Sequence, residues 1–154
     1  MTPFGPNTPS RVLPDVQALR PNGMTPIAAS LQEAAKDFSG KDGQNNIIVL
    51  LSDGEEDCNG DPCAAAKAVH DAGIHLQVNV IGFHVGPKER TQLQCVARAG
   101  GGKYYDAANA GELKVATSDV KERIEATPAP TTPAPSATPT YVKAEEGLAK
   151  SPRR

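Results

Sequence analysis

The 154-residue sequence predicts an α/β fold of three layers, in which a parallel sheet carries helices on both faces. Helix and strand patterns alternate along the chain. The run from Ile47 to Leu51 is apolar at consecutive positions, which indicates a strand covered on both faces. Because prolines crowd both ends, we expect one domain over residues 12–125. It should contain about three strands and four helices. An irregular segment, 1–11, precedes it, and a disordered Pro/Thr/Ala-rich linker and polar tail, 126–154, follow.

The first strongly patterned helix is expected to begin at Thr25 and Pro26, a hydroxyl N-cap followed by proline at the first helical position. Apolar residues then recur every three to four positions on one face, at Ile27, Leu31, Ala35 and Phe38. Upstream, the prolines leave room only for a short helix over Asp15–Leu19. The strand over residues 47–52 follows this helix.

The rest of the domain repeats this order. Asp61 and Pro62 are typical of a helix start and open a second helix, which continues through residues 64–72. A second strand over residues 76–83 and a third helix over residues 87–99 follow, and three glycines separate that helix from a third strand over residues 103–107. A fourth helix covers residues 109–125. Because a helix separates each strand from the next, the strands are expected to run parallel.

Charge and hydropathy argue against two classes of partner. The chain has 16 Lys and Arg against 18 Asp and Glu, and no stripe of basic and aromatic residues that could hold a phosphate backbone, so we expect no nucleic-acid partner. The longest apolar run is far shorter than the ~20 residues needed to cross a bilayer, so we expect no membrane insertion by this chain. Residues 1–22 lack the pattern of a signal peptide.

An acidic loop follows the strand over residues 47–52, and it is the most informative feature of the chain. Ligands of open parallel sheets gather beyond the carboxyl ends of the strands, where Asp53 is expected to lie, with Thr25 beside it. A hydroxyl and a carboxylate suit Mg²⁺, so Thr25 and Asp53 are the candidate metal ligands. The alternative reading is a solvated loop, because neighbouring exposed charges such as Glu55, Glu56 and Asp57 repel each other only weakly in water.

The three cysteines leave more than one pairing open. Cys58 and Cys63 flank a tight turn and are the disulfide candidates, a bridge that would suit an oxidising compartment. The alternative is a pair of reduced thiols. Cys95, on the third predicted helix, is either free or paired with one of the other two.

Four blocks of the sequence resemble the later part of a von Willebrand factor type A domain of the bacterial, extracytoplasmic kind. They are "NGMTPIAASLQEAAKDF", "IIVLLSDGEEDC", "GIHLQVNVIGF" and "QLQCVARAGGGKYYDA". The resemblance implies a doubly wound sheet and a metal-ion-dependent adhesion site. In this site Thr25 matches the family's threonine and Asp53 its third-loop aspartate. The family's Asp-x-Ser-x-Ser loop has no counterpart here, so the resemblance implies a partial fold.

The resemblance implies a protein-binding or adhesion module, not an enzyme, with an incomplete adhesion site and a protein ligand of unknown identity. Mg²⁺ or Mn²⁺ would belong to the complete domain and bind this chain weakly or not at all. An alternative is a truncated or split domain without independent activity, which associates with itself through an exposed strand edge. A metal-assisted hydrolase is less favoured, because no nucleophile or base accompanies the acidic loop. An extracytoplasmic location is favoured for the parent domain.

Overall fold

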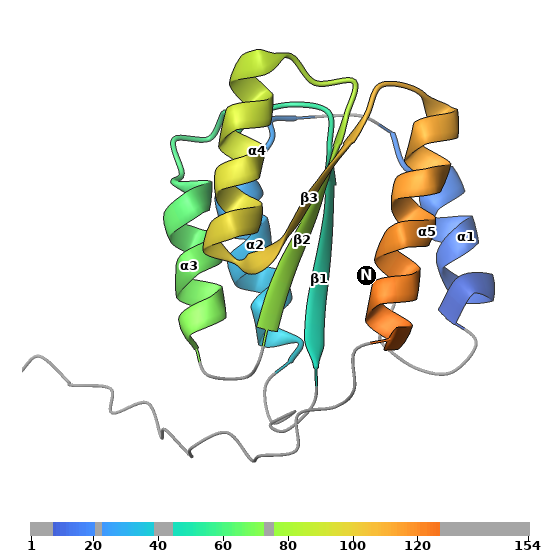
Figure 1. Ribbon diagram of the computed structural model, residues 1–154, viewed down its shortest axis with the longest axis horizontal. Helices are drawn as coiled ribbons and strands as arrows, with labels where there is room; N and C mark the ends of the chain where they lie inside the picture. Colours follow the sequence, from blue (N-terminus) through green and yellow to red (C-terminus); the bar gives the residue numbers. More distant parts are fainter. Residues whose placement is uncertain (1–7, 21–22, 39–44, 73–75, 127–154) are drawn as a thin grey trace, which may run out of the picture.

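The computed structural model describes residues 8–20, 23–38, 45–72 and 76–126 (Figure 1). The predicted linker and tail over residues 127–154 lie outside these described residues. In chain order the elements are α1 (Thr8–Ala18), α2 (Ile27–Lys36), β1 (Asn46–Ser52), α3 (Pro62–Asp71), β2 (Leu76–Phe83), α4 (Pro87–Ala99), β3 (Gly101–Ala107) and α5 (Ala110–Ala126).

The strands form one parallel sheet in the order β1-β2-β3. β2 pairs with both neighbours. Leu76 at its start lies opposite Asn46 of β1, and Phe83 at its end lies opposite Ala107 of β3. Its side chains are accordingly the most deeply buried of the sheet, and Val78 and Val80 are inaccessible to solvent. Among the described strands, β1 and β3 form the two edges.

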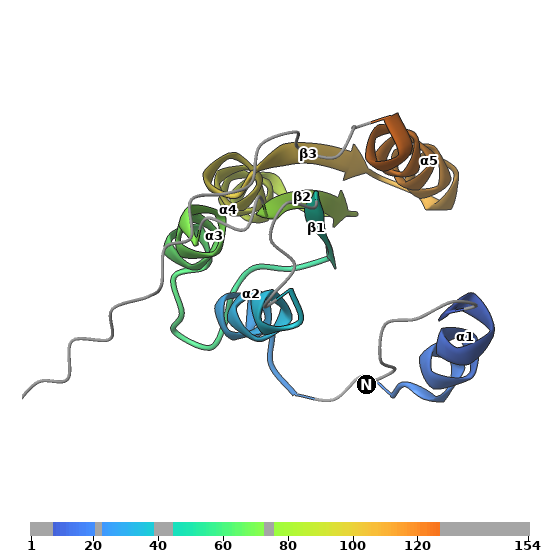
Figure 2. The same cartoon turned by 90° about the horizontal axis from the view of Figure 1, so that it is seen from below.

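The helices cover both faces of this sheet, which confirms the predicted three-layer α/β fold (Figure 2). On one face, α2, α3 and α4 enclose a hydrophobic cluster that includes Leu31, Ala66 and Leu93. On the other face, α5 packs over β2 and β3 through Ala116 and Val120. The core is therefore built where period-two strand faces meet the apolar faces of the helices.

The predicted helix starts hold to different degrees. Asp61 caps α3 as expected, because its side chain accepts a hydrogen bond from Ala64 N at 2.9 Å while Pro62 opens the helix. Thr25 was expected to cap α2, and that prediction is wrong by one residue. The N-cap is Pro26, and no side chain of its own turn caps the helix.

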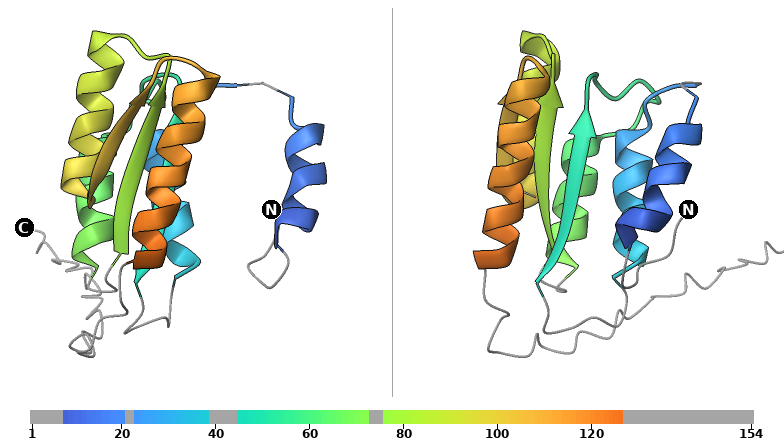
Figure 3. Two further views of the ribbon diagram at one scale, coloured as in Figure 1. Left: turned by 45° about the vertical axis from the view of Figure 1, so that its right-hand side comes forward. Right: turned by 90° about the vertical axis from the view of Figure 1, so that its right-hand side faces the viewer.

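The helix α1 begins at Thr8, inside the segment 1–11 that is predicted to be irregular, so the prediction of only a short helix over Asp15–Leu19 is wrong. Proline is tolerated in the first turn of a helix, where the missing N–H has no intrahelical partner, so Pro14 is the only proline beyond the first turn of α1. Figure 3 shows α1 set apart from the sheet and its covering helices. Accordingly, Leu13, Val16 and Leu19 remain more than half exposed.

The prediction that β1 is covered on both faces is wrong. Ile48 and Leu50 pack against the core, but Val49 and Leu51, which point to the opposite face, are 43% and 54% exposed. The physical reason is the position of β1 at the edge, since α5 packs on the two other strands. An apolar side of β1 therefore lies open. Among the described residues, no helix is long and apolar enough to cross a bilayer.

Candidate functional site at the carboxyl edge of the sheet

The three parallel strands end at the same side of the molecule, and four connections meet there (Figure 1). They are the segment before α2 and the loops after β1, β2 and β3, at residues 23–26, 53–61, 84–86 and 108–109. We call this region the carboxyl edge. Ligand sites of open parallel sheets lie at such an edge, so a functional site is expected here.

The N-terminus of α2 takes its cap from the loop after β1. The first amide N–H groups of an α-helix have no partner within the helix. In α2 the N-cap residue, Pro26, has no side-chain acceptor for them. Glu56 supplies the acceptor, and Ala28 N donates to its Oε2 at 2.7 Å. The carboxylate also faces the positive end of the helix dipole. An acidic residue far along the chain therefore performs the task of the missing N-cap side chain.

Glu56 holds two other parts of the structure as well. Its second oxygen, Oε1, accepts hydrogen bonds from Cys58 N at 3.0 Å and Gly60 N at 3.4 Å, which closes the loop on itself. Its backbone N donates to Oε1 of Gln92 on α4 at 2.8 Å. Glu56 thus joins α2, its own loop and α4.

Asp57 makes the neighbouring connection to Thr25. Thr25 N donates to Oδ1 of Asp57, and Asp57 N donates back to Thr25 O at 3.3 Å. We call this pair and the Glu56–Ala28 hydrogen bond the α2 clamp. The clamp fixes the backbone of Thr25 against the loop that begins with Asp53.

Two backbone features let the loop approach α2 so closely. A Cβ at Gly60 would lie 2.6 Å from the Cβ of Ala28, so only glycine fits at this contact. Asn59 has a φ of 62°, a left-handed conformation that asparagine tolerates better than most residues. The tight turn of the sequence therefore brings the acidic loop onto the helix start.

The structure brings the two predicted metal ligands to the same edge. Ser52 holds the turn after β1 through hydrogen bonds of its hydroxyl with Gly54, and Asp53 projects from that turn as an exposed side chain. Thr25, which precedes α2, is half-buried and contacts the same loop through its hydrogen bond to Asp57. Neither the Thr25 hydroxyl nor the Asp53 carboxylate has a hydrogen-bond partner among the described residues.

These residues do not complete a Mg²⁺ site. Mg²⁺ takes six oxygen ligands in octahedral geometry, and Thr25 and Asp53 would supply two. Glu56 is engaged by the clamp, and Glu55 pairs with Lys88 at 2.7 Å. Within the described ranges, no three His, Cys, Asp or Glu side chains are grouped so that they could hold a metal ion.

The disulfide joins Cys63 to Cys95, so the expected Cys58–Cys63 bridge is not formed. Cys63 lies in the first turn of α3, which packs against α4, and the Cα atoms of Cys63 and Cys95 are 5.7 Å apart. Cys58 remains a half-buried thiol beside the α2 clamp. Partial burial, followed by the neighbouring Asp57 and Glu56 carboxylates, raises the pKa of this thiol.

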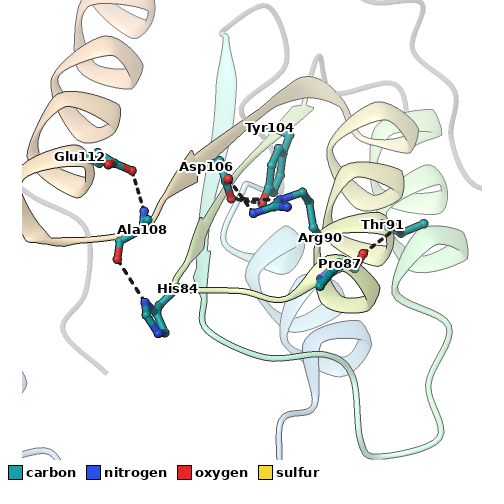
Figure 4. A network of polar contacts seen from close by, with 8 residues as sticks. All are labelled: His84, Pro87, Arg90, Thr91, Tyr104, Asp106, Ala108 and Glu112. Carbon is teal, nitrogen blue, oxygen red and sulfur yellow. Dashed lines mark hydrogen bonds and ion pairs between the residues drawn. The ribbon is translucent and has the colours of Figure 1, made fainter.

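A second polar network lies at the other half of the carboxyl edge (Figure 4). Arg90 on α4 donates to both carboxylate oxygens of Asp106, at 3.3 and 2.8 Å, and the Tyr104 hydroxyl donates to Asp106 Oδ1 at 2.9 Å. Burial, with a further contribution from Asp106, raises the pKa of Tyr104 to about 12, although Arg90 acts in the opposite direction. The network ties the end of β3 to α4.

His84 borders a cavity of about 320 Å³ next to this network, together with Gly86, Arg90 and Asp106. Its backbone is held in a left-handed conformation, with a φ of 55°. Its Nδ1 lies 3.1 Å from Ala108 O, and because a carbonyl oxygen can only accept, Nδ1 carries a proton. The cavity therefore offers imidazole, guanidinium and carboxylate groups to polar groups of a partner.

The sequence predictions missed the role of Glu56, Asp57 and Gln92. One feature of the sequence that indicates such a role is Pro26. A helix whose N-cap residue is a proline has no capping side chain of its own and needs an acceptor from elsewhere. The chain position of that acceptor follows only from the fold. The Arg90–Asp106 pair gives no local sequence signal, because its members belong to different elements.

No protein-family model matches the chain. Two curated proteins of Bacillus subtilis are similar to it. The uncharacterized protein YwmD is 38% identical over 99 residues, which cover 64% of this chain and 44% of YwmD. The uncharacterized protein YwmC is 40% identical over 96 residues, which cover 62% of this chain and 41% of YwmC. The chain therefore spans less than half the length of these curated relatives.

Two solved structures share the fold. The conserved hypothetical protein BatB from Bacteroides thetaiotaomicron has a TM-score of 0.56 and 21% identity, over 72% of this chain and 64% of that one. Proximal thread matrix protein 1 from the mussel byssus has a TM-score of 0.60 and 18% identity, over 75% of this chain and 29% of that one. At such identities the likeness concerns the fold, and it supports a von Willebrand factor A-like fold for this chain.

The α2 clamp predicts a large difference between two adjacent glutamates. Replacing Glu56 with Ala leaves the amides of Ala28, Cys58 and Gly60 without their acceptor and should lower the free energy of unfolding by about 1–3 kcal/mol. The matched control, Glu55→Ala, removes only a surface ion pair with Lys88 and should cost about 0–1 kcal/mol. Urea denaturation measures both, and equal losses would contradict the clamp.

The raised pKa of Tyr104 predicts a loss of stability at high pH. A free tyrosine ionises near pH ~10, so the folded state favours the neutral phenol and loses this stabilisation as the pH rises from about 10 to about 12. Carbon-13 NMR of the tyrosine ring, with Tyr104→Phe to assign the signal, measures the pKa directly. Asp106→Asn should lower it, and ionisation of Tyr104 near pH ~10 in the parent chain would contradict the network.

Proposed function

We propose that this chain is part of a protein-binding module of the von Willebrand factor A class, with the carboxyl edge as its recognition surface. The observation that carries the proposal is the α2 clamp. Asp57 fixes Thr25 against the loop that carries Asp53, at the edge where ligands of this kind of sheet bind. In the family, a threonine and an aspartate at these places hold a cation that contacts a carboxylate of the protein ligand.

The proposed cation site is incomplete within this chain. Thr25 and Asp53 supply two oxygen ligands for Mg²⁺ or Mn²⁺, and water would fill the other positions. The ion should therefore bind weakly or not at all until further ligands join. When bound in the complete module, it would offer an open position to a carboxylate, and this chain's part is to orient the hydroxyl and the carboxylate.

A role as one part of a split domain is the second candidate, and the edge strand β1 favours it. Val49 and Leu51 expose an apolar side of β1, and Leu13 and Val16 of α1 are more than half exposed, with no covering element in the part of the chain that the structure describes. An edge strand also presents backbone groups that can pair with another strand. Another strand, from further sequence or from a second polypeptide, would cover this edge.

A metal-assisted hydrolase has less support, because such an enzyme needs a base beside the cation. The α2 clamp engages Glu56 and Asp57, and Lys88 neutralises Glu55. Binding without catalysis is therefore the favoured reading. The Cys63–Cys95 disulfide supports an extracytoplasmic location, since disulfides persist in oxidising compartments.

Paramagnetic broadening by Mn²⁺ tests the proposed cation position. In the nitrogen-15 spectrum of the full chain, Mn²⁺ at roughly millimolar concentration should first broaden the amide signals of Thr25, Asp53 and Gly54. Asp53→Asn should abolish this local effect. The same exchange at Asp119, an exposed aspartate on α5, is the matched control and should leave it unchanged. Broadening elsewhere, broadening that survives Asp53→Asn, or micromolar affinity would contradict the proposal.

Sedimentation velocity over a range of concentrations tests the open edge of β1. We expect the parent chain to self-associate and Leu51→Lys to shift it toward monomer, because a charge on an edge strand opposes strand pairing. Val115→Lys is the matched control, since Val115 is an exposed valine on α5 away from β1. A parent chain that stays monomeric, or equal effects of both variants, would contradict the role of the edge.

A further inference from the structure

One turn of α4 connects the disulfide to the α2 clamp. Gln92 precedes Cys95 by three residues and so lies on the same side of the helix. The side-chain oxygen of Gln92, Oε1, accepts a hydrogen bond from Glu56 N at 2.8 Å, and the backbone carbonyl oxygen of Gln92 lies 3.9 Å from Cys63 Sγ. The bridge that holds α3 to α4 therefore also holds the part of α4 on which Glu56 rests.

The bridge also fixes the far end of the acidic loop. The loop leaves β1 at Asp53 and enters α3 at Pro62, one residue before Cys63. With the disulfide intact, both ends are anchored, one in the sheet and one on α4. Without it, the segment from Asp57 to Cys63 gains conformational freedom, which weakens every hydrogen bond that the loop makes with α2.

The disulfide is within reach of a reductant from outside the chain. Cys63 and Cys95 are both half-buried residues, so the bridge lies at the margin of the core and not in its interior. Cys58 precedes Cys63 by five residues, but its raised pKa keeps it mostly a thiol at neutral pH, and thiolates, not thiols, attack disulfides. Opening the bridge therefore depends on an external dithiol and not on Cys58.

We propose that the Cys63–Cys95 disulfide is a redox lock on the α2 clamp. A dithiol reductant transfers two electrons and two protons. The S–S bond breaks, Cys63 and Cys95 become thiols, and the dithiol closes to its own disulfide. The first turn of α3 then separates from α4, Gln92 loses its fixed place beside Glu56, and Glu56 and Asp57 release Ala28 and Thr25. The sheet remains folded.

The consequence for a cation or a protein ligand rests on the proposed function, because the clamp holds the backbone of Thr25 against the loop that begins with Asp53. The lock itself does not depend on that function. It is tested by hydrogen exchange, which reports the clamp whether or not a cation binds. If reduction leaves the clamp amides unchanged but Mn²⁺ still broadens the signals near Asp53, the redox lock is wrong and the proposed function stands. If reduction loosens the clamp but Mn²⁺ causes no such broadening, the lock stands and the proposed cation site is wrong.

Residue-resolved hydrogen exchange of the full 154-residue chain, oxidised and after reduction, is the test. On reduction, the amides of Ala28, Cys58 and Gly60 should exchange about tenfold faster or more, while those of Val78 and Val80 in β2 keep their rates. Oxidised Gln92→Ala should reproduce much of this effect, because it removes the contact between α4 and Glu56. Cys58→Ser should respond to reduction as the parent does.

Two results would overturn the lock. If reduction leaves the three loop and helix amides unchanged, the disulfide does not hold the clamp. If it accelerates the amides of β2 by the same factor, the bridge stabilises the whole fold and has no special relation to the clamp. The final comparison is the Gln92→Ala variant before and after reduction. If the disulfide acts through Gln92, reduction should accelerate the exchange of the clamp amides only slightly further in that variant.

Discussion

The hydrogen bonds from the start of α2 to the carboxylates of Glu56 and Asp57 are the interaction on which this carboxyl edge depends. The N-cap of α2 is Pro26, whose side chain cannot accept a hydrogen bond, so the loop after β1 supplies the acceptors. The same carboxylates would repel one another in an unanchored loop, but here they face amide donors and the positive end of a helix. The acidic character of the loop is thus explained first by structure, and Asp53 is left exposed without a hydrogen-bond partner among the described residues.

The clamp also shows why the two halves of the edge differ. On the β1 side, backbone amides donate to Glu56 and Asp57, and the Thr25 hydroxyl and the Asp53 carboxylate have no hydrogen-bond partner among the described residues. On the β3 side, charges are paired between side chains, as in the Arg90–Asp106 contact, and they surround a cavity. A partner that binds the whole edge would meet an oxygen-rich region at one end and a mixed, hydrogen-bonding region at the other.

Local patterns in the sequence predict most of the fold and little of the site. The strand over residues 76–83 and the helix over residues 87–99 are predicted from the sequence, and the structure has both with these bounds. The Cys63–Cys95 pairing and the cap on α2 join distant segments, so no local spacing encodes them. The exposure of Val49 is a further case, because an apolar edge strand reads like a central one. The placement of Thr25 beside Asp53 is predicted from the position of the strand end and the helix start, and the resemblance to the family agrees with it.

The most direct measurement of the clamp is scalar coupling across its hydrogen bonds in a sample labelled with nitrogen-15 and carbon-13. Coupling should connect the Ala28 amide nitrogen to the carboxylate carbon of Glu56, and the Thr25 amide nitrogen to that of Asp57. Small temperature coefficients of both amide protons should accompany it. If neither coupling is seen and both protons shift with temperature as solvent-exposed amides do, the loop does not hold α2 and the α2 clamp does not exist in solution.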